Sequence, residues 1–296
     1  QAAGTLDWRV LVLALGTVFF AGLMEALRWK LLLHKEPVST VRLFLVKHAG
    51  QGLNNFSPIR LVAEAAQTAM LRYGNGISTP KVVSSLVMAR LFDLLVTVNL
   101  VGAGLVVLPQ LAGLRPFVLP LWAMTSAALI ALVVLGGRMH RMPGVRRFVA
   151  LEAMLRTIGS VGARPGVMLA CILLTAASWM SIGAAAWMVA GAAGIGLPFW
   201  LMAIVIVAVT LFSATTPAPP GAVGVYEFAV ISTLTLFAVE PSVALTFALV
   251  VHGILFLPAM LIGIPVLALE RKTLKGILTR RRKPSTLAAL TSEAAT

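Results

Sequence analysis

The sequence predicts an all-α polytopic membrane protein, and three observations lead to that expectation. Of its 296 residues 59% are hydrophobic and only 11% charged, which is more apolar surface than a soluble domain of this length can bury. Several apolar stretches are long enough for helices of about 20 residues, the length that crosses a hydrocarbon core of about 30 Å. None of these stretches alternates in the way a membrane-barrel strand does.

The distribution of positive charge predicts which connections face the cytoplasm. The formal net charge is +14, but Lys and Arg gather between the apolar stretches, chiefly in residues 28–47, 138–164 and 271–283. Such segments normally stay on the cytoplasmic side, where they meet anionic lipid headgroups, so a nucleic-acid partner is not expected. The connections 109–116, 192–197 and 213–241 carry little or no positive charge and are expected outside. The C-terminus is then cytoplasmic.

With this orientation the predicted spans account for every crossing of the membrane except in two segments. Each of these segments must begin and end on the same side of the membrane. The predicted spans are 8–33, 82–108, 117–137, 167–191 and 241–269. Residues 41–76 are too polar for two full spans and break at Asn54, Asn55 and Pro58. Residues 198–238 break at Pro217, Pro219, Pro220 and Gly221, although their apolar arms could also span fully. Proline interrupts helical hydrogen bonding, and a break at membrane depth must be packed in protein or line a wet cavity.

The order of these elements predicts an inverted repeat of span, broken re-entrant hairpin and span, with one linking helix. We expect a first repeat at 1–108 with a cytoplasmic-side hairpin at 41–76, a linking helix and basic amphipathic cytoplasmic connector at 109–166, a second repeat at 167–270 with an outer-side hairpin at 198–238, and a basic, disordered tail at 271–296. Inverted repeats of broken helices are typical of transporters, whose substrate lies near the midplane where the breaks meet.

Two stretches resemble a known family. Residues 54–95, "NNFSPIRLVAEAAQTAMLRYGNGISTPKVVSSLVMARLFDLL", and residues 215–230, "TTPAPPGAVGVYEFAV", are similar to the transmembrane region of the lysylphosphatidylglycerol synthase/flippase family. The positions that match the motifs are Pro58, Arg60, Glu64, Arg90 and Asp93 in the first stretch and Pro220, Gly221, Gly224 and Glu227 in the second. The chain departs from the pattern at Ala63, Ala222, Tyr226 and His252, which bears on the substrate more than on the fold.

The resemblance implies lipid translocation without lipid synthesis, because only a short tail follows residue 270, where the bifunctional members have a synthase domain. The substrate would be a membrane phospholipid or a polyprenyl-linked lipid with an anionic or aminoacylated headgroup. The expected location is the plasma (inner) membrane of a bacterium or archaeon. Apolar helices rich in small residues, such as "SIGAAAWMVAGAAGIG", could pack within one chain or between two copies in a homodimer.

Candidate residues of the first hairpin follow from the cost of charge in a membrane. Arg60 begins the helix predicted at 60–73, where free backbone N–H groups favour an anion, so it is a phosphate-binding candidate; it could also be an interfacial arginine that snorkels to the headgroups. Glu64 could pair with Arg60 or with Arg90. Arg90 and Asp93 share a helix face; they could form a structural ion pair, or Arg90 could bind a phosphate while Asp93 orients it. Asn55, with Asn54, could cap the broken helix.

Candidate residues of the second hairpin centre on Glu227, which follows the glycine-rich turn that contains Gly224. It has no basic neighbour in sequence, so its partner comes from elsewhere or it is protonated. It could accept a cationic headgroup or a transport-driving proton, or it could accept hydrogen bonds from backbone amides of the opposing hairpin. Tyr226 and His252 complete the set of candidates, and a lone buried histidine also fits a packing role.

Other classes of function find less support in the sequence. No hydrolase elbow, Walker loop, paired metal-binding histidines or cysteine cluster is present, so no catalytic residue, metal or cofactor is predicted. The predicted function is a flippase-like lipid transporter rather than an enzyme. The alternatives are an integral membrane enzyme that modifies a lipid-linked substrate with Glu64 or Glu227 as general base, or a non-transporting subunit of a lipid-modifying assembly.

Overall fold

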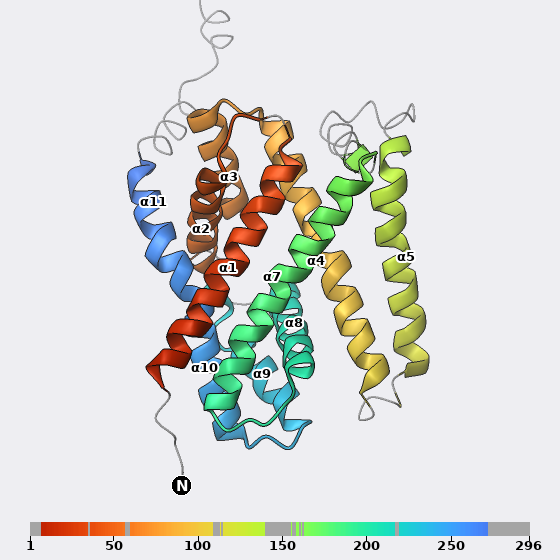
Figure 1. Cartoon of the computed structure of the whole chain (residues 1–296), viewed down its shortest axis with the longest axis vertical. Coiled ribbons are helices and arrows are strands. Elements are labelled where there is room, and N and C mark those ends of the chain that lie inside the picture. Colours follow the sequence, from red (N-terminus) through yellow and green to blue (C-terminus); the bar gives the residue numbers. More distant parts are fainter. Residues whose placement is uncertain are drawn as a thin grey trace, which may run out of the picture.

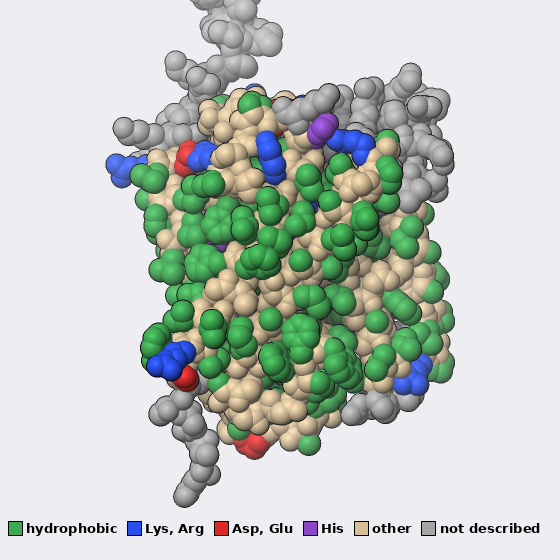
Figure 2. All heavy atoms as spheres, viewed as in Figure 1, with side chains coloured by type: hydrophobic (Ala, Val, Ile, Leu, Met, Phe, Trp, Pro, Cys, Tyr) green, Lys and Arg blue, Asp and Glu red, His purple; other side chains and the backbone are tan. Residues whose placement is uncertain are grey.

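The computed structural model describes residues 7–34, 36–56, 60–108, 113, 115–139, 155, 158–159, 161, 163–216 and 219–271. Within these residues the regular structure is helical and includes no strand. Four helices are long and apolar enough to cross a membrane, namely Trp8–Leu32, Thr79–Val107, Pro165–Ala192 and Pro241–Leu269. Hydrophobic side chains cover the middle of the face in Figure 2, while charged side chains gather toward its two ends. The predicted all-α membrane fold is therefore confirmed.

The first half consists of a long helix, a hairpin of two shorter helices and a second long helix. Helix α1 is Trp8–Leu32 and α4 is Thr79–Val107, with α2 (Thr40–Phe56) and α3 (Arg60–Asn75) between them. We call α2 and α3 the first hairpin. Pro80 lies in the first turn of α4, where no intrahelical donor is lost.

The second half has the same order of elements. Helix α7 is Pro165–Ala192, and the second hairpin consists of α8 (Phe199–Thr215), the short 3₁₀ turn η3 (Pro220–Ala222) and α9 (Val225–Thr235). The last long helix begins as α10 (Pro241–Pro258), passes through the π-helical segment η4 (Ala259–Gly263) and ends as α11 (Ile264–Leu269). In the chain, helix α5 (Arg115–Met139) connects the two halves, and in the fold it packs against α4.

The two hairpins occupy opposite ends of the molecule. In Figure 1 the first hairpin fills the upper half and the second hairpin the lower half, and α1 crosses the whole height beside α7. The α1–α7 contact is the most extensive helix–helix contact in the described chain. Each hairpin has its own hydrophobic cluster: Leu43, Val46 and Met70 pack with Trp29 in one, and Met202, Val230 and Phe247 pack together in the other.

The observed helices agree closely with the predicted spans and hairpins. The described apolar part of α5, at the place of the predicted linking helix, is the shorter stretch Leu119–Ala131. The basic connector and the C-terminal tail lie almost wholly outside the described residues, as do Pro58 and Pro217. The shared order of elements is what an inverted repeat requires, and the two-fold relation itself stays a prediction.

Candidate functional site

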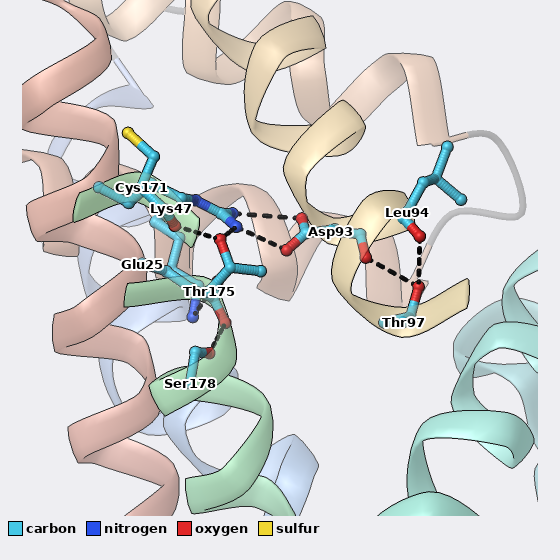
Figure 3. Close-up of polar contacts among 9 residues, drawn as sticks. Glu25, Lys47, Asp93, Leu94, Thr97, Cys171, Thr175 and Ser178 are labelled. Atoms are coloured by element: carbon cyan, nitrogen blue, oxygen red, sulfur yellow. Dashed lines mark hydrogen bonds and ion pairs between the residues drawn. The ribbon is translucent and has the colours of Figure 1, made fainter. Parts of the chain in front are cut away.

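A buried ion pair joins the middle of α4 to α1. The guanidinium of Arg28 donates to Asp93, with Nη1 2.7 Å from Oδ1 and Nη2 3.2 Å from Oδ2. Arg28 Nη1 also lies 2.7 Å from Oγ1 of Thr175 on α7, which in turn donates to the carbonyl of Cys171. Figure 3 shows Asp93 and Thr175 facing each other from α4 and α7. The interaction therefore ties three long helices together.

A second ion pair joins α1 to the first hairpin. Lys47 Nζ on α2 lies 3.0 Å from Oε2 of Glu25, and the Ser178 hydroxyl on α7 donates to Oε1 of Glu25 at 3.1 Å. Glu25 and Arg28 are one helical turn apart on α1, so the two ion pairs are neighbours. Figure 3 draws Glu25, Lys47 and Ser178 beside Asp93 and Thr175. We call Glu25, Arg28, Lys47 and Asp93, with Thr175 and Ser178, the polar network.

The polar network lies within the membrane-spanning part of the fold. Asp93 is midway along α4 (Thr79–Val107), and its side chain is 24% exposed although that of Arg28 is 4% exposed. Glu25 and Lys47 are also partly exposed. Charged groups at this depth are costly in hydrocarbon and normally face the bundle interior or a water-filled cavity. Asp93, Glu25 and Lys47 are therefore not fully enclosed by the described part of the chain.

Arg90 lies one turn before Asp93 on α4 and is far more open. Its Nε atom is 3.8 Å from Oε1 of Glu64 on α3, and the side chains are 60% and 35% exposed, respectively. This distance is a loose ion pair and too long for a hydrogen bond. The prediction that Glu64 could pair with Arg90 is confirmed. The prediction that Arg90 could pair with Asp93 is wrong, because Arg28 on α1 occupies both carboxylate oxygens of Asp93.

The second hairpin places Glu227 against His252 of α10. Glu227 Oε1 is 2.6 Å from Nδ1 of His252, and Oε2 accepts from the backbone N–H of Gly224 at 2.6 Å. The other ring nitrogen of His252, Nε2, lies 3.0 Å from the Gly221 carbonyl. The partner of Glu227 therefore comes from α10, which is the first of the two predicted alternatives. The predicted bonds to backbone amides of the opposing hairpin are wrong, since the amide that Glu227 binds belongs to its own turn.

The glycines of that turn adopt a conformation that other residues disfavour. Gly221 has φ +70° and Gly224 has φ +85°, the left-handed region in which a Cβ is strained. These angles reverse the chain between α8 and α9, so that Gly224 becomes the N-cap of α9 and its N–H reaches Glu227. The predicted break at Pro219, Pro220 and Gly221 is observed at this position.

The ends of the two hairpins meet. The turn η3 contacts α2, and a Cβ on Gly221 would lie 3.4 Å from the backbone oxygen of Asn55 in the last turn of α2. Asn55 and Asn54 lie inside α2, which ends at Phe56, and Asn55 Nδ2 is buried with no partner among the described residues. The predicted capping role of the asparagines is therefore not seen. Tyr226 packs its ring 4.4 Å from that of His252, and its buried hydroxyl likewise lacks a described partner.

Some of the predicted site residues contact one another in the structure, some have other partners, and the side chain of one lies outside the described residues. Glu64 faces Arg90, and Glu227, Tyr226 and His252 form one cluster. Asp93 belongs to the polar network instead. Arg60 is the first residue of α3, and its side chain lies outside the described residues. Among the side chains that the structure describes, no group of three or more His, Cys, Asp or Glu could hold a metal ion.

Sequence reasoning missed Glu25, Arg28 and Lys47. The sequence analysis treats residues 28–47 only as a basic segment, whose sidedness stays a prediction. The structure shows that Arg28 is buried inside α1 and that Lys47 lies within α2 and pairs with Glu25. The signal that could have found them is Glu25, an acidic residue one turn before Arg28 at the end of an otherwise apolar span. An intramembrane charge is a functional-site hypothesis by default.

Fold and site together define a helical membrane protein in which two broken hairpins meet and charged side chains lie at membrane depth. The chain belongs to the family described as the lysylphosphatidylglycerol synthase TM region, whose family model matches residues 1–263. The predicted resemblance is thus confirmed over most of the chain. No curated protein and no solved structure matches it.

Proposed function

We propose that the protein is a transporter that moves a lipid with an anionic headgroup across the bilayer. The observation that carries the proposal is Arg90, a guanidinium 60% exposed on a membrane-spanning helix, whose ion-pair partner among the described residues is Glu64 at 3.8 Å. A charge in that position needs a hydrated space and an anionic partner. The planar fork of arginine suits a phosphate, which it can bind through two parallel hydrogen bonds.

The loose Arg90–Glu64 pair differs from the tight pairs of the polar network in a way that fits substrate binding. Arg28 and Lys47 are committed to Asp93 and Glu25 at 2.7 and 3.0 Å. An incoming phosphate could replace Glu64 at Arg90 without leaving a buried carboxylate, because Glu64 is itself 35% exposed. Arg60, which begins α3 one turn before Glu64, is the second proposed phosphate ligand.

The lipid tails would stay in hydrocarbon while the headgroup crosses. An apolar pocket of about 80 Å³ lies between α4, α8 and α9, and its lining includes Val101, Leu105, Ile204, Ala208, Leu236 and Phe237. It offers a place for part of an acyl or isoprenoid chain. The phospholipid or polyprenyl-linked identity of the substrate, the bacterial or archaeal inner membrane and the cytoplasmic C-terminus belong to the same proposal. The basic segments support that orientation.

The proposal is tested with the purified chain in phosphatidylcholine vesicles that contain fluorescent, short-chain phosphatidylglycerol as the probe lipid. Transbilayer movement is measured by chemical quenching of the outer leaflet. We expect Arg90→Ala to slow movement about ten-fold or more, the effect of losing a hydrogen bond to a charged group worth about 1.5–3 kcal/mol. Arg90→Lys should recover part of the rate, because it keeps the charge but not the fork.

The matched control is Arg72→Ala, which removes an exposed arginine at the far end of α3 that donates to Thr79. This variant should move the probe lipid at the unaltered rate. Equal rates for Arg90→Ala and the unaltered chain, with the same unfolding temperature, would remove the proposed site. Mass-spectrometric detection of a chemically altered probe lipid would favour the membrane enzyme instead.

A further inference from the structure

We infer that Glu227 and His252 form a proton-binding site and that a proton crosses the membrane together with the anionic headgroup. This inference rests on the proposed function for its second part, whereas its first part stands on the geometry of the second hairpin alone. His252 has a hydrogen-bond acceptor on each side: the carboxylate of Glu227, 2.6 Å from Nδ1, and the carbonyl of Gly221, 3.0 Å from Nε2.

The two contacts fix the number of protons. A carbonyl oxygen only accepts, so Nε2 of His252 must carry a hydrogen. The 2.6 Å contact between Nδ1 and Glu227 needs a further hydrogen between the two atoms. A neutral imidazole carries only one, so the observed pair holds one proton more than a neutral histidine beside a carboxylate. Two arrangements satisfy every contact: an imidazolium beside a carboxylate, and an imidazole whose Nδ1 accepts from a Glu227 carboxylic acid. Imidazole is ordinarily the stronger base, so we infer the imidazolium with the carboxylate, a charge-assisted pair.

Release of that proton must break one of the two contacts. If the remaining hydrogen stays on Nε2, two lone pairs face each other between Nδ1 and Glu227. If it moves to Nδ1, the bond to Gly221 is lost. The side chains of Glu227 and His252 are only 11% and 12% exposed, so water cannot freely replace the lost partner. The proton therefore determines whether α10 keeps both of its contacts with the second hairpin, one to Glu227 of α9 and one to Gly221 of η3.

The contacts of His252 with Glu227 and Gly221 lie where the two hairpins meet. The carbonyl of Gly221 accepts from His252, and a Cβ at Gly221 would lie 3.4 Å from the backbone oxygen of Asn55 on α2. The same residue therefore contacts α10 and lies next to the first hairpin. The ring of Phe256, one turn after His252, lies edge-on to the imidazole at 4.7 Å and would overlap a Cβ at Gly221. A change at His252 thus reaches the contact between the hairpins directly.

No other charge among the described residues competes for this proton. Helix α8 and the segments η3 and η4 carry no ionisable side chain, α7 carries the buried Cys171, and α9 adds Tyr226, whose ring lies tilted against that of His252. The charged side chains of α1 and α2, which also pack against α10, have partners of their own: Glu25 with Lys47, Arg28 with Asp93, Lys30 with the Glu36 carbonyl, Arg42 with Glu270, and Arg9 with the Trp8 ring. His48 on α2 faces the Phe44 carbonyl.

Charge balance couples this proton to an anionic headgroup. Without the proton the Glu227–His252 pair has a net charge of −1, and with it the pair is neutral. An anion that reaches the meeting point of the hairpins is repelled by the first form and tolerated by the second, so headgroup and proton favour each other's binding, and this coupling is reciprocal. An anion that crosses with one proton also moves no net charge against the membrane potential.

The proton site is tested first by nuclear magnetic resonance on the full chain in detergent, labelled with nitrogen-15 at histidine. The resonances of His252 are those missing from His252→Gln. We expect two directly bonded N–H groups on this ring at neutral pH. A single N–H group together with an ionised Glu227 carboxylate, read from carbon-13 labelled glutamate and its loss in Glu227→Gln, would overturn the site, whatever the transport activity.

The coupling is tested in the vesicles described above, loaded with a pH-sensitive dye. Movement of the anionic probe lipid should carry protons in the same direction, and with one proton per lipid a gradient of about one pH unit supports an up to about ten-fold asymmetry of the probe. His252→Gln should lose the proton flux, and the matched control His48→Gln, which replaces the other described histidine of the helical interior, should keep it.

The outcomes separate the two proposals. If movement of the probe lipid does not depend on the pH gradient, or carries protons in the opposite direction, the proposed coupling is wrong. The proposed transport function is not affected by that result. Failure of the unaltered chain to move the probe overturns the proposed function, and the coupling with it. The count of N–H groups on His252 and the ionisation of Glu227 then still decide the proton site by themselves.

Discussion

The carboxylate of Asp93 on α4 receives two hydrogen bonds from the guanidinium of Arg28 on α1, at 2.7 and 3.2 Å. Asp93→Ala leaves this arginine, 4% exposed, without its counter-charge. Removal of one partner of a buried pair costs about 3–5 kcal/mol, and the partial exposure of Asp93 puts the expected loss of unfolding free energy near the lower end, about 3 kcal/mol. Thermal unfolding in detergent measures it.

The matched double variant, Arg28→Met with Asp93→Leu, removes both charges at once. Replacing a whole buried pair by apolar side chains of similar size is often neutral for stability, so the double variant should unfold near the temperature of the unaltered chain. A double variant as unstable as Asp93→Ala would show that the bond between Arg28 and Thr175 matters more than the ion pair.

Gly221→Ala should destabilise the second hairpin for two reasons. Its φ of +70° costs an alanine roughly 1–2 kcal/mol, and the new methyl group would lie 2.5 Å from Cζ of Phe256. Phe256→Ala, alone and combined with Gly221→Ala, completes a double-mutant cycle that separates the overlap from the backbone strain. A coupling of zero in this cycle, measured by unfolding temperature, would mean that the phenyl ring moves aside at no cost.

Gly263→Ala tests the close contact between η4 and α2. A Cβ at this position would lie 2.3 Å from the backbone oxygen of His48, and a backbone atom cannot turn away as a side chain can. Overpacking of this kind costs about 1–3 kcal/mol. Gly253→Ala on α10, which has nothing within 4 Å of its added methyl group, should leave the unfolding temperature nearly unchanged.

Glu240 predicts a pH dependence outside the membrane-spanning segments. As the N-cap of α10 it accepts from the Ser242 hydroxyl and from the backbone N–H groups of Ser242 and Val243 at 3.0 and 3.1 Å. The Ser242 hydroxyl, followed by these amides, lowers the pKa of Glu240 below its ordinary value of 4.5. The stabilisation is then present above pH 4.5 and is lost as the pH falls through the lower, folded-state pKa.

Thermal unfolding against pH checks this expectation. The unaltered chain should unfold at a higher temperature than Glu240→Gln above pH 4.5, and the two curves should converge as the pH falls below that value. Curves that stay a constant distance apart down to strong acid would show that ionisation of Glu240 contributes nothing to the cap.

The fold could be predicted from the sequence because its signals are local. Runs of apolar residues fixed the long helices to within a few positions, and the cluster from Pro219 to Gly224 fixed the turn of the second hairpin, since proline and glycine act on the backbone at their own position. The Arg90–Glu64 pair could also be predicted from the sequence, because both residues belong to the motif that resembles the family.

The polar network could not be predicted, because its partners are chosen by packing between distant helices. Arg28 and Asp93 are 65 residues apart and Glu25 and Ser178 are 153 apart, so no spacing rule joins them. Helical spacing made Arg90 the obvious partner of Asp93, yet the close approach of α1 offered a buried arginine instead. His252 was selected as a departure from the family motif, and only the fold shows that it faces Glu227.

The long sequence separation within the polar network has a consequence for biosynthesis. Thr175 follows Arg28 by 147 residues, which at about 5–20 residues per second takes a ribosome roughly 7–30 seconds to add. Throughout that interval α1 exists without its neighbour α7, and for the first part of it without Asp93 as well. The counter-charge Asp93 follows Arg28 by only 65 residues, so the nascent α1 carries this arginine without Asp93 for roughly 3–13 seconds of that interval.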